Sequence, residues 1–403
     1  MRKFWAVVLL MAFLLIPINC YAFHVPLEEV GKSTINFLEN SNVSLVSYQI
    51  FLRVRSGFTS VNTSMVLKNL NTEAPVSFLM GIPVQLDSIT SVRDLSVVSN
   101  NKAINYKQRN ISKDATNENI ANISKWYTWE ISLQPGESKI IECAFSMDNK
   151  TDLDGTKRID IPLQLLQGWA GQISNVQIIA DLDFYPPYVF EPNPSIIPLE
   201  YDKDGRITWR FKDVNAFESK LSIFFKPIET VVLNYCKNIT SNEQIVAVLN
   251  LFETKDYHGT IQQIDQLLSG EIDPEISSLS SELKFIQAIC YKELYQLDKA
   301  LERFNEIEGN VGFGGTLSNA IRNKIIYDKT MILKGLHNGE EKALAYLNEV
   351  KPSVENNEVF LIWLNDEIKR LTPEPPKVEE TKDKEESVTE NNEGAKTEDE
   401  EEK

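Results

Sequence analysis

The stretch SELKFIQAICYKELYQLDKALERFNEIE, residues 281–308, decides the C-terminal half of the chain. Its residues Ala288, Tyr291, Ala300 and Phe304 lie at offsets of 0, 3, 12 and 16. A small residue on each of two neighbouring helices lets them cross closely, and the two aromatic rings fill the space beside the crossing. The stretch therefore predicts a hairpin of two helices.

This spacing resembles the tetratricopeptide (TPR) repeat, and the resemblance extends over residues 240–371. A second copy keeps the four offsets upstream, and a third lies downstream with a first-helix candidate at Ala320–Leu333. These copies contain Val248, Leu251, Thr260 and Ile264, and Ala343, Leu347 and Val350. Glu358–Leu371 is expected to be a capping helix. An unrelated helical bundle remains the alternative.

The TPR resemblance implies a concave surface lined by the first helix of each hairpin, which suits an extended peptide or a partner helix. By repeat position alone, Lys284, Gln287 and Lys292 would line that groove. The leading hypothesis is accordingly a protein or peptide partner.

Upstream of the helices the period of the apolar residues is two. In Ser47–Arg55, Tyr48, Ile50, Leu52 and Val54 share one face, the pattern of a half-buried strand. Two further runs, Trp126–Leu133 and Ser138–Met147, are joined by Gln134-Pro135-Gly136-Glu137, which has the chemistry of a type II turn. The alternation predicts a β-sandwich. Residues 100–122 are expected to form a long exposed loop.

The period changes from two to 3.6 near residue 230. We therefore expect a multidomain fold, an all-β sandwich followed by an all-α TPR-like hairpin domain and a disordered acidic tail. The expected boundaries are 1–22 for a signal peptide, 23–229 for the sandwich, 230–371 for the helical repeats and 372–403 for the tail.

The strand order of residues 23–229 resembles an exported bacterial sandwich domain of unknown function, of the DUF4424 type. Tyr48–Val54, Met65–Asn69 and Val76–Pro83 carry the resemblance, together with Ile207–Phe211 and Leu221–Phe225. The family supplies no catalytic residues to carry over.

The first 22 residues read as a secretory signal. Arg2 and Lys3 precede an uncharged apolar run, Phe4–Ile18, and Cys20-Tyr21-Ala22 places small residues at the cleavage positions. We expect an extracytoplasmic protein, secreted or associated with the cell envelope, and an uncleaved N-terminal anchor is the alternative. No second apolar run is long enough to span a bilayer. The sequence has a bacterial character.

Charge excludes one class of partner. The net charge is −17, and residues 372–403 alone hold 13 acidic side chains against 5 lysines. A nucleic-acid binder needs a basic footprint, so nucleic acid is not an expected partner. The tail has too few apolar residues to order itself.

No catalytic, cofactor or metal constellation is visible. The three histidines are scattered, and Cys143, Cys236 and Cys290 read as buried thiols, with a Cys143–Cys236 disulfide as the alternative. Asp152–Gly155 and Asp202–Gly205 have Gly too early for a calcium loop and predict β-turns instead. We therefore expect a non-enzyme without cofactors, with an unfamiliar acid pair as the minor alternative.

The second function hypothesis is a carbohydrate- or cell-wall-binding module. Tyr127 and Trp129 share one face of a strand, where an exposed pair of rings could stack on sugars. Core packing is the more common role of such aromatics.

Overall fold

The computed structural model describes most of the chain between residues 23 and 373. The described residues are 23–31, 34–38, 41–55, 57–84, 91–112, 125–161, 163, 166, 168–182, 185–192, 199–202, 204–214, 221–269, 273–308, 316–354 and 357–373. The predicted signal peptide lies outside them, and so does the predicted acidic tail from residue 374 onward.

The N-terminal region is built of strands and the C-terminal region of helices. The strands are β1 (Val25–Gly31), β2 (Thr34–Phe37), β3 (Val43–Val54), β4 (Phe58–Asn69), β5 (Val76–Pro83), β6 (Val92–Ser99), β7 (Lys102–Ala103), β8 (Lys107–Ile111), β9 (Lys125–Leu133), β10 (Ser138–Asp148), β11 (Lys150–Thr151), β12 (Lys157–Ile161), β13 (Ile173–Asp181), β14 (Phe190–Pro192), β15 (Leu199–Tyr201), β16 (Arg206–Val214) and β17 (Leu221–Phe225). The helices are η2 (Pro187–Val189), α2 (Ile228–Ile239), α3 (Glu243–Glu253), α4 (Tyr257–Ser269), α5 (Pro274–Ser278), α6 (Ser280–Glu293), α7 (Leu297–Glu308), α8 (Thr316–Lys334), α9 (Gly339–Val350), η3 (Lys351–Ser353) and α10 (Glu358–Leu371).

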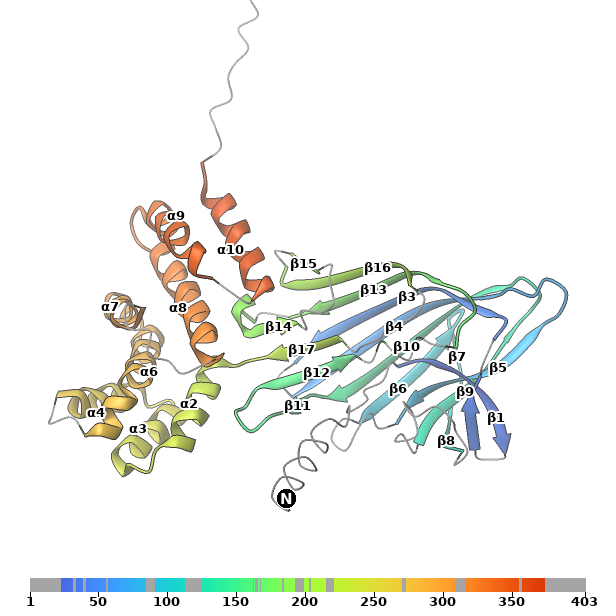
Figure 1. The fold of residues 1–403 in the computed structure, drawn as a ribbon, viewed down its shortest axis with the longest axis horizontal. Helices are drawn as coiled ribbons and strands as arrows, with labels where there is room; N and C mark the ends of the chain where they lie inside the picture. The colour runs from blue at the N-terminus through green and yellow to red at the C-terminus, as the bar shows by residue number, and fades with distance from the viewer. Residues whose placement is uncertain are drawn as a thin grey trace, which may run out of the picture. The chain divides into compact units, whose positions relative to one another are not determined.

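An eight-stranded sheet forms the centre of the strand region, in the order β15-β16-β13-β3-β4-β10-β6-β7 (Figure 1). Strand β4 alternates strictly: Val61, Thr63, Met65 and Leu67 are buried while their neighbours are not. β3 pairs antiparallel with β4 and parallel with β13. The alternation leaves one face of these strands packed on the core and the other polar.

Five other strands close into a barrel in the order β1-β2-β8-β9-β5. The chain passes from the barrel to the large sheet through the turn at Gln134–Glu137. There the Glu137 N–H donates to the Gln134 carbonyl at 3.0 Å, and Gly136 has a φ of +67°. The type II turn is confirmed, but the strands it joins belong to different sheets. A smaller sheet, β11-β12-β17-β14, completes the strand region.

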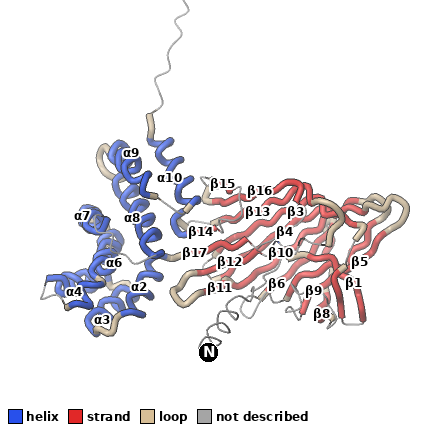
Figure 2. Tube along the Cα trace, in the orientation of Figure 1, coloured by secondary structure: helices blue, strands red, loops and turns tan. Residues whose placement is uncertain are grey.

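The helices follow one another as antiparallel hairpins (Figure 2). Helices α3 and α4, α6 and α7, and α8 and α9 contact as pairs. Ala288, Ala300 and Phe304 are fully buried and Tyr291 nearly so, which fits the close crossing expected from the sequence. Asn242 caps α3 by accepting from the Gln244 and Ile245 N–H groups. Among the described residues, no helix has the length and apolar content to cross a membrane.

A buried charge cluster ties the helices to the strand region; we call it the Lys324 joint, comprising Tyr188, Glu229, Lys324 and Asp328. The Lys324 Nζ lies 2.7 Å from Glu229 Oε1 on α2 and 2.9 Å from Asp328 Oδ2 on α8. It also donates to the Tyr188 hydroxyl in η2 at 3.1 Å. Helix α10 packs beside β14, β15 and η2. Sheet and helices therefore share one interior.

The fold-class prediction of an independent sandwich and a separate helical domain is wrong. Residues up to Leu371 form one compact unit, and the strands form three sheets, one of them a closed barrel. What holds is the coarser layout, strands over 25–225 followed by helices over 228–371. Alternation shows which face of a strand is buried but not which distant element covers that face. The contact between the two regions was also missed because nothing in the sequence distinguishes Lys324 from a surface lysine.

Candidate functional site

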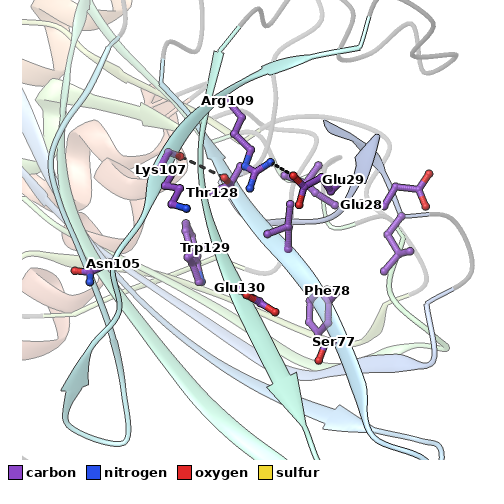
Figure 3. Close-up of a pocket in the computed structure, with 13 residues that line it drawn as sticks. Glu28, Glu29, Ser77, Phe78, Asn105, Lys107, Arg109, Thr128, Trp129 and Glu130 are labelled. Atoms are coloured by element: carbon purple, nitrogen blue, oxygen red, sulfur yellow. Dashed lines mark hydrogen bonds and ion pairs between the residues drawn. The ribbon is translucent and has the colours of Figure 1, made fainter. Parts of the chain in front are cut away.

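The barrel opens at one end into a hollow of about 390 Å³, shown in Figure 3. We call this hollow the barrel mouth. Strands β1, β5, β8 and β9 supply its wall. Its charged and polar aliphatic side chains are Glu28, Glu29, Ser77, Asn105, Lys107, Arg109, Thr128 and Glu130.

Strand register explains why these side chains share one face. Lys107 is opposite Thr128, and Thr128 is opposite Gly81, which in turn is opposite Val25. Every second residue along each strand points the same way. One face of the barrel wall therefore carries Glu29, Ser77, Lys107, Arg109, Thr128 and Glu130.

The floor of the same face is apolar. Leu27 and Trp126 are fully buried there and Gly81 lies between them. A Cβ on Gly81 would collide with the Leu27 side chain and lie 3.2 Å from the Trp126 ring. The missing side chain allows β1 and β9 to pack tightly across β5 at the floor.

The rim holds charges of both signs, and only some of them are paired. Arg109 Nη1 donates to Glu29 Oε1 at 2.8 Å, and the Thr128 hydroxyl donates to the Lys107 backbone carbonyl at 3.2 Å. Within the part of the chain that the structure describes, the Lys107 ammonium and the Glu130 carboxylate have no hydrogen bond or ion pair. The Nε of Arg109 is buried without an acceptor among those residues.

The mouth is lined by charged and polar groups of several kinds. Its lining contains ammonium, guanidinium, carboxylate, hydroxyl and amide groups but no imidazole or thiol. Among the described residues, no three His, Cys, Asp or Glu side chains gather as a metal site. The three described cysteines are unpaired and buried. Burial raises the pKa of Cys143, Cys236 and Cys290 to about 12, which disfavours the nucleophilic thiolate.

The predicted sugar-stacking pair lies on the opposite face of β9. Trp129 is 2% exposed and packs edge-to-face on His24, with 6.0 Å between ring centroids. Tyr127 is half-buried against Tyr106 at 5.2 Å. Trp129 borders the mouth as part of the strand, while its ring belongs to the core.

The predicted groove residues of the helical region are occupied by intramolecular contacts. Gln287 is fully buried and donates to Asp265 at 2.7 Å. Lys284 lies 3.0 Å from Glu306, and Lys292 lies 3.0 Å from Asp328 of the Lys324 joint. The structure does not bring these three side chains together around an open hollow.

A separate hollow of about 460 Å³ lies on the helical region, between α3, α4 and α5. Polar side chains dominate its lining. The lining residues are Glu243, Gln244, Ala247, Gln263, Gln266, Leu267 and Ile276.

Comparison with known proteins gives no assignment. No family model matches the chain, and no curated protein matches it. Among solved structures, a crystal structure of a candidate nutrient-binding protein from Legionella pneumophila is similar, with a TM-score of 0.48 and 14% identity over 77% of this chain and 100% of that one. A likeness at this level supports no statement about function.

The mouth residues were not predicted from the sequence. Residues 100–122 were expected to form a loop, yet Lys107–Ile111 is strand β8. Lys107 and Arg109 line the mouth and no residue of β8 is buried, so the strand lacks the alternation of apolar and polar residues that usually identifies one. The spacing of the two cations by two residues, Lys107-Gln108-Arg109, was the only available signal.

Proposed function

We propose that the protein is an exported, non-enzymatic binding protein that takes a small polar ligand into the barrel mouth. One observation carries the proposal: a hollow of about 390 Å³ with an apolar floor and a partly unpaired charged rim. Ligand sites in proteins have this size and composition, and the mouths of β-barrels are a common place for them. Export rests on the signal-like character of residues 1–22.

Unpaired charges in the mouth favour binding over a structural role. Lys107 and Glu130 are both exposed at the mouth, so both charges are accessible to a ligand. A ligand that supplies the missing counter-charges would be stabilised by charge-assisted hydrogen bonds.

A blocking variant tests the proposal. Ser77 lies on the mouth face and its hydroxyl bonds only Ser132, at 3.1 Å, among the described residues. Ser77→Trp should fill the hollow, while Ser138→Trp, exposed at the start of β10, is the matched control. We expect a panel of sugars, amino acids, dipeptides and organic acids to contain a member that raises the melting temperature of the wild type and the control but not of Ser77→Trp. A panel without any such member would contradict the proposal.

A protein or peptide partner at the helical region is the second candidate function. The hollow between α3, α4 and α5 favours it, as does the TPR-like spacing of the hairpins. Because the Lys324 joint unites the two regions, point variants are a better test than deletion of the helices. Ala247→Arg should abolish in-cell crosslinks to a specific partner, and Asn250→Arg, exposed on the same helix, should retain them. Equal crosslinking by both variants would exclude this surface.

A glycan remains within the panel as one class of ligand. Since the Trp129 ring is buried, a sugar would have to contact the mouth rather than a Tyr127–Trp129 platform. Loss of sugar binding in Ser77→Trp would place it there.

A further inference from the structure

The charges of the barrel mouth are arranged in two groups. Lys107 and Arg109 lie two residues apart on the same face of β8, which separates their Cα atoms by about 6.6 Å. Glu130 lies on the neighbouring strand, two residues beyond the partner of Lys107. Diagonal neighbours of this kind are about 7–8 Å apart, which long side chains can span, yet the Lys107 ammonium and the Glu130 carboxylate make no ion pair among the described residues. The mouth therefore presents two cations on β8 and an uncompensated carboxylate on β9.

The cationic side has capacity left for an anion. Glu29 occupies Nη1 of Arg109 and is itself half exposed. The Arg109 Nε lacks an acceptor among the described residues, and Lys107 has its three donors free of described partners. A carboxylate between these two side chains would accept charge-assisted hydrogen bonds from both.

The anionic side has capacity left for a cation. The Glu130 carboxylate faces the mouth opposite Leu79 of β5 and makes no hydrogen bond or ion pair among the described residues. An ammonium donates three hydrogen bonds and suits one carboxylate together with a neighbouring hydroxyl or amide. Ser77, Thr128 and Asn105 supply such groups around the rim.

We propose that the barrel mouth selects a small zwitterion, a free amino acid or dipeptide, with its carboxylate between Lys107 and Arg109 and its ammonium at Glu130. This inference rests on the proposed function and names its ligand class. An apolar side chain of the ligand would reach the floor at Leu27. A neutral sugar would leave both charged groups unneutralised, and a simple anion or cation would neutralise only one of them.

Blocking one end of the ligand at a time tests the charge assignment. The probes are leucine and leucyl-leucine, their N-acetyl forms, their C-terminal amides and glucose, titrated calorimetrically into the full chain. We expect at least one zwitterion to bind. Removal of either ligand charge should weaken it by about tenfold or more, as for loss of a hydrogen bond to a charged group.

Variants assign each end to its residue. Lys107→Met should weaken the zwitterion and reduce the difference in affinity between the zwitterion and its amide, because only Arg109 would then hold the carboxylate. Glu130→Gln should bind the zwitterion no better than wild type binds the N-acetyl form. Lys102→Met and Glu142→Gln, exposed on other strands, are controls with unchanged affinity, and unchanged melting temperatures show that each variant folds.

The outcomes separate this inference from the proposed function. Equal affinity for the zwitterion, its blocked forms and glucose would overturn the zwitterion assignment while leaving a ligand site at the mouth. Binding of a sugar or organic acid from the wider panel, with none of leucine or leucyl-leucine, would do the same. If no compound of either panel binds, both the zwitterion assignment and the proposed function are overturned.

Discussion

The barrel mouth and the Lys324 joint use the same kinds of charged side chain in opposite ways. In the joint, Lys324 is 1% exposed and contacts Glu229, Asp328 and Tyr188 at 2.7–3.1 Å. In the mouth, Lys107 and Glu130 have no partner among the described residues. Charges that are paired with one another stabilise the fold, whereas charges without a partner among the described residues remain available to a ligand.

The surroundings of Lys324 show how a buried ion is kept charged. Burial alone would lower its pKa, but the carboxylates of Asp328 and Glu229 outweigh burial and raise the pKa of Lys324 well above its usual range. The lysine is thus an ammonium at every physiological pH. Removing it leaves carboxylates behind in a site built for a cation.

The largest expected effect comes from breaking the joint. Lys324→Met should lower the free energy of unfolding by about 3 kcal/mol, as for other buried ion pairs that lose one partner. Urea denaturation measures the change. Lys237→Met, which removes a lysine from the exposed Glu253, should cost below about 1 kcal/mol. Equal losses in the two variants would show that the joint is no different from a surface pair.

A double variant sharpens this result. Lys324→Met with Asp328→Leu removes both charges of the 2.9 Å pair, so it should be more stable than Lys324→Met alone. Replacement of a whole buried ion pair by apolar residues is often neutral. A double variant less stable than the single one would mean that packing rather than charge dominates.

An intermediate effect on stability is expected at His24, which is buried like Lys324 but stays neutral. Its ring accepts or donates a hydrogen bond at 2.7 Å to the Tyr48 hydroxyl, and burial lowers its pKa from 6.5 to about 3. Below pH 6.5 His24 therefore becomes protonated in the unfolded chain but stays neutral in the folded chain. The stability contributed by neutral His24 is present above pH 6.5 and is lost as the pH falls toward 3, with a loss of about 2 kcal/mol by pH 5.

Urea denaturation at pH 7.5 and pH 5 checks this pH dependence. His24→Gln should remove most of the difference between the two pH values, although it lowers stability at both. His258→Gln changes an exposed histidine and should leave the difference intact. A wild-type protein that is equally stable at both pH values would contradict the burial of a neutral His24.

The smallest effect is expected at the mouth. Glu29→Gln removes one side of the Arg109 pair, and because Glu29 is half exposed, the unfolding free energy should change by less than about 1 kcal/mol. Denaturation of this variant beside Lys324→Met measures the contrast directly. A loss as large as that of Lys324→Met would make the mouth a structural cluster.

Local signals in the sequence proved more informative than long-range ones. The turn at Pro135-Gly136 was predicted correctly because proline and glycine set their own backbone angles. The strands on either side of it, β9 and β10, were not assigned to separate sheets, since these pairings join residues more than forty positions apart. Likewise, Ala288 and Phe304 indicated a helical hairpin, while nothing near Lys324 in the sequence indicated its partners Tyr188 and Glu229.

The residues of the barrel mouth were not predicted from the sequence for a related reason. A strand that faces a polar interior carries charged residues where an ordinary strand carries apolar ones, so Lys107 and Arg109 resembled a loop. Only the pairing of β8 with β9 and β2 places them at the mouth of a barrel.

The parallel pairing of β3 with β13 affects the order in which the sheet can form as the chain is synthesised. A chain that emerges from its N-terminus presents β3 and β4 together, but the second edge of β3 finds its partner only when residues 175–181 have followed. Until then the longest strands of the sheet expose a row of unsatisfied N–H and C=O groups to any neighbouring chain.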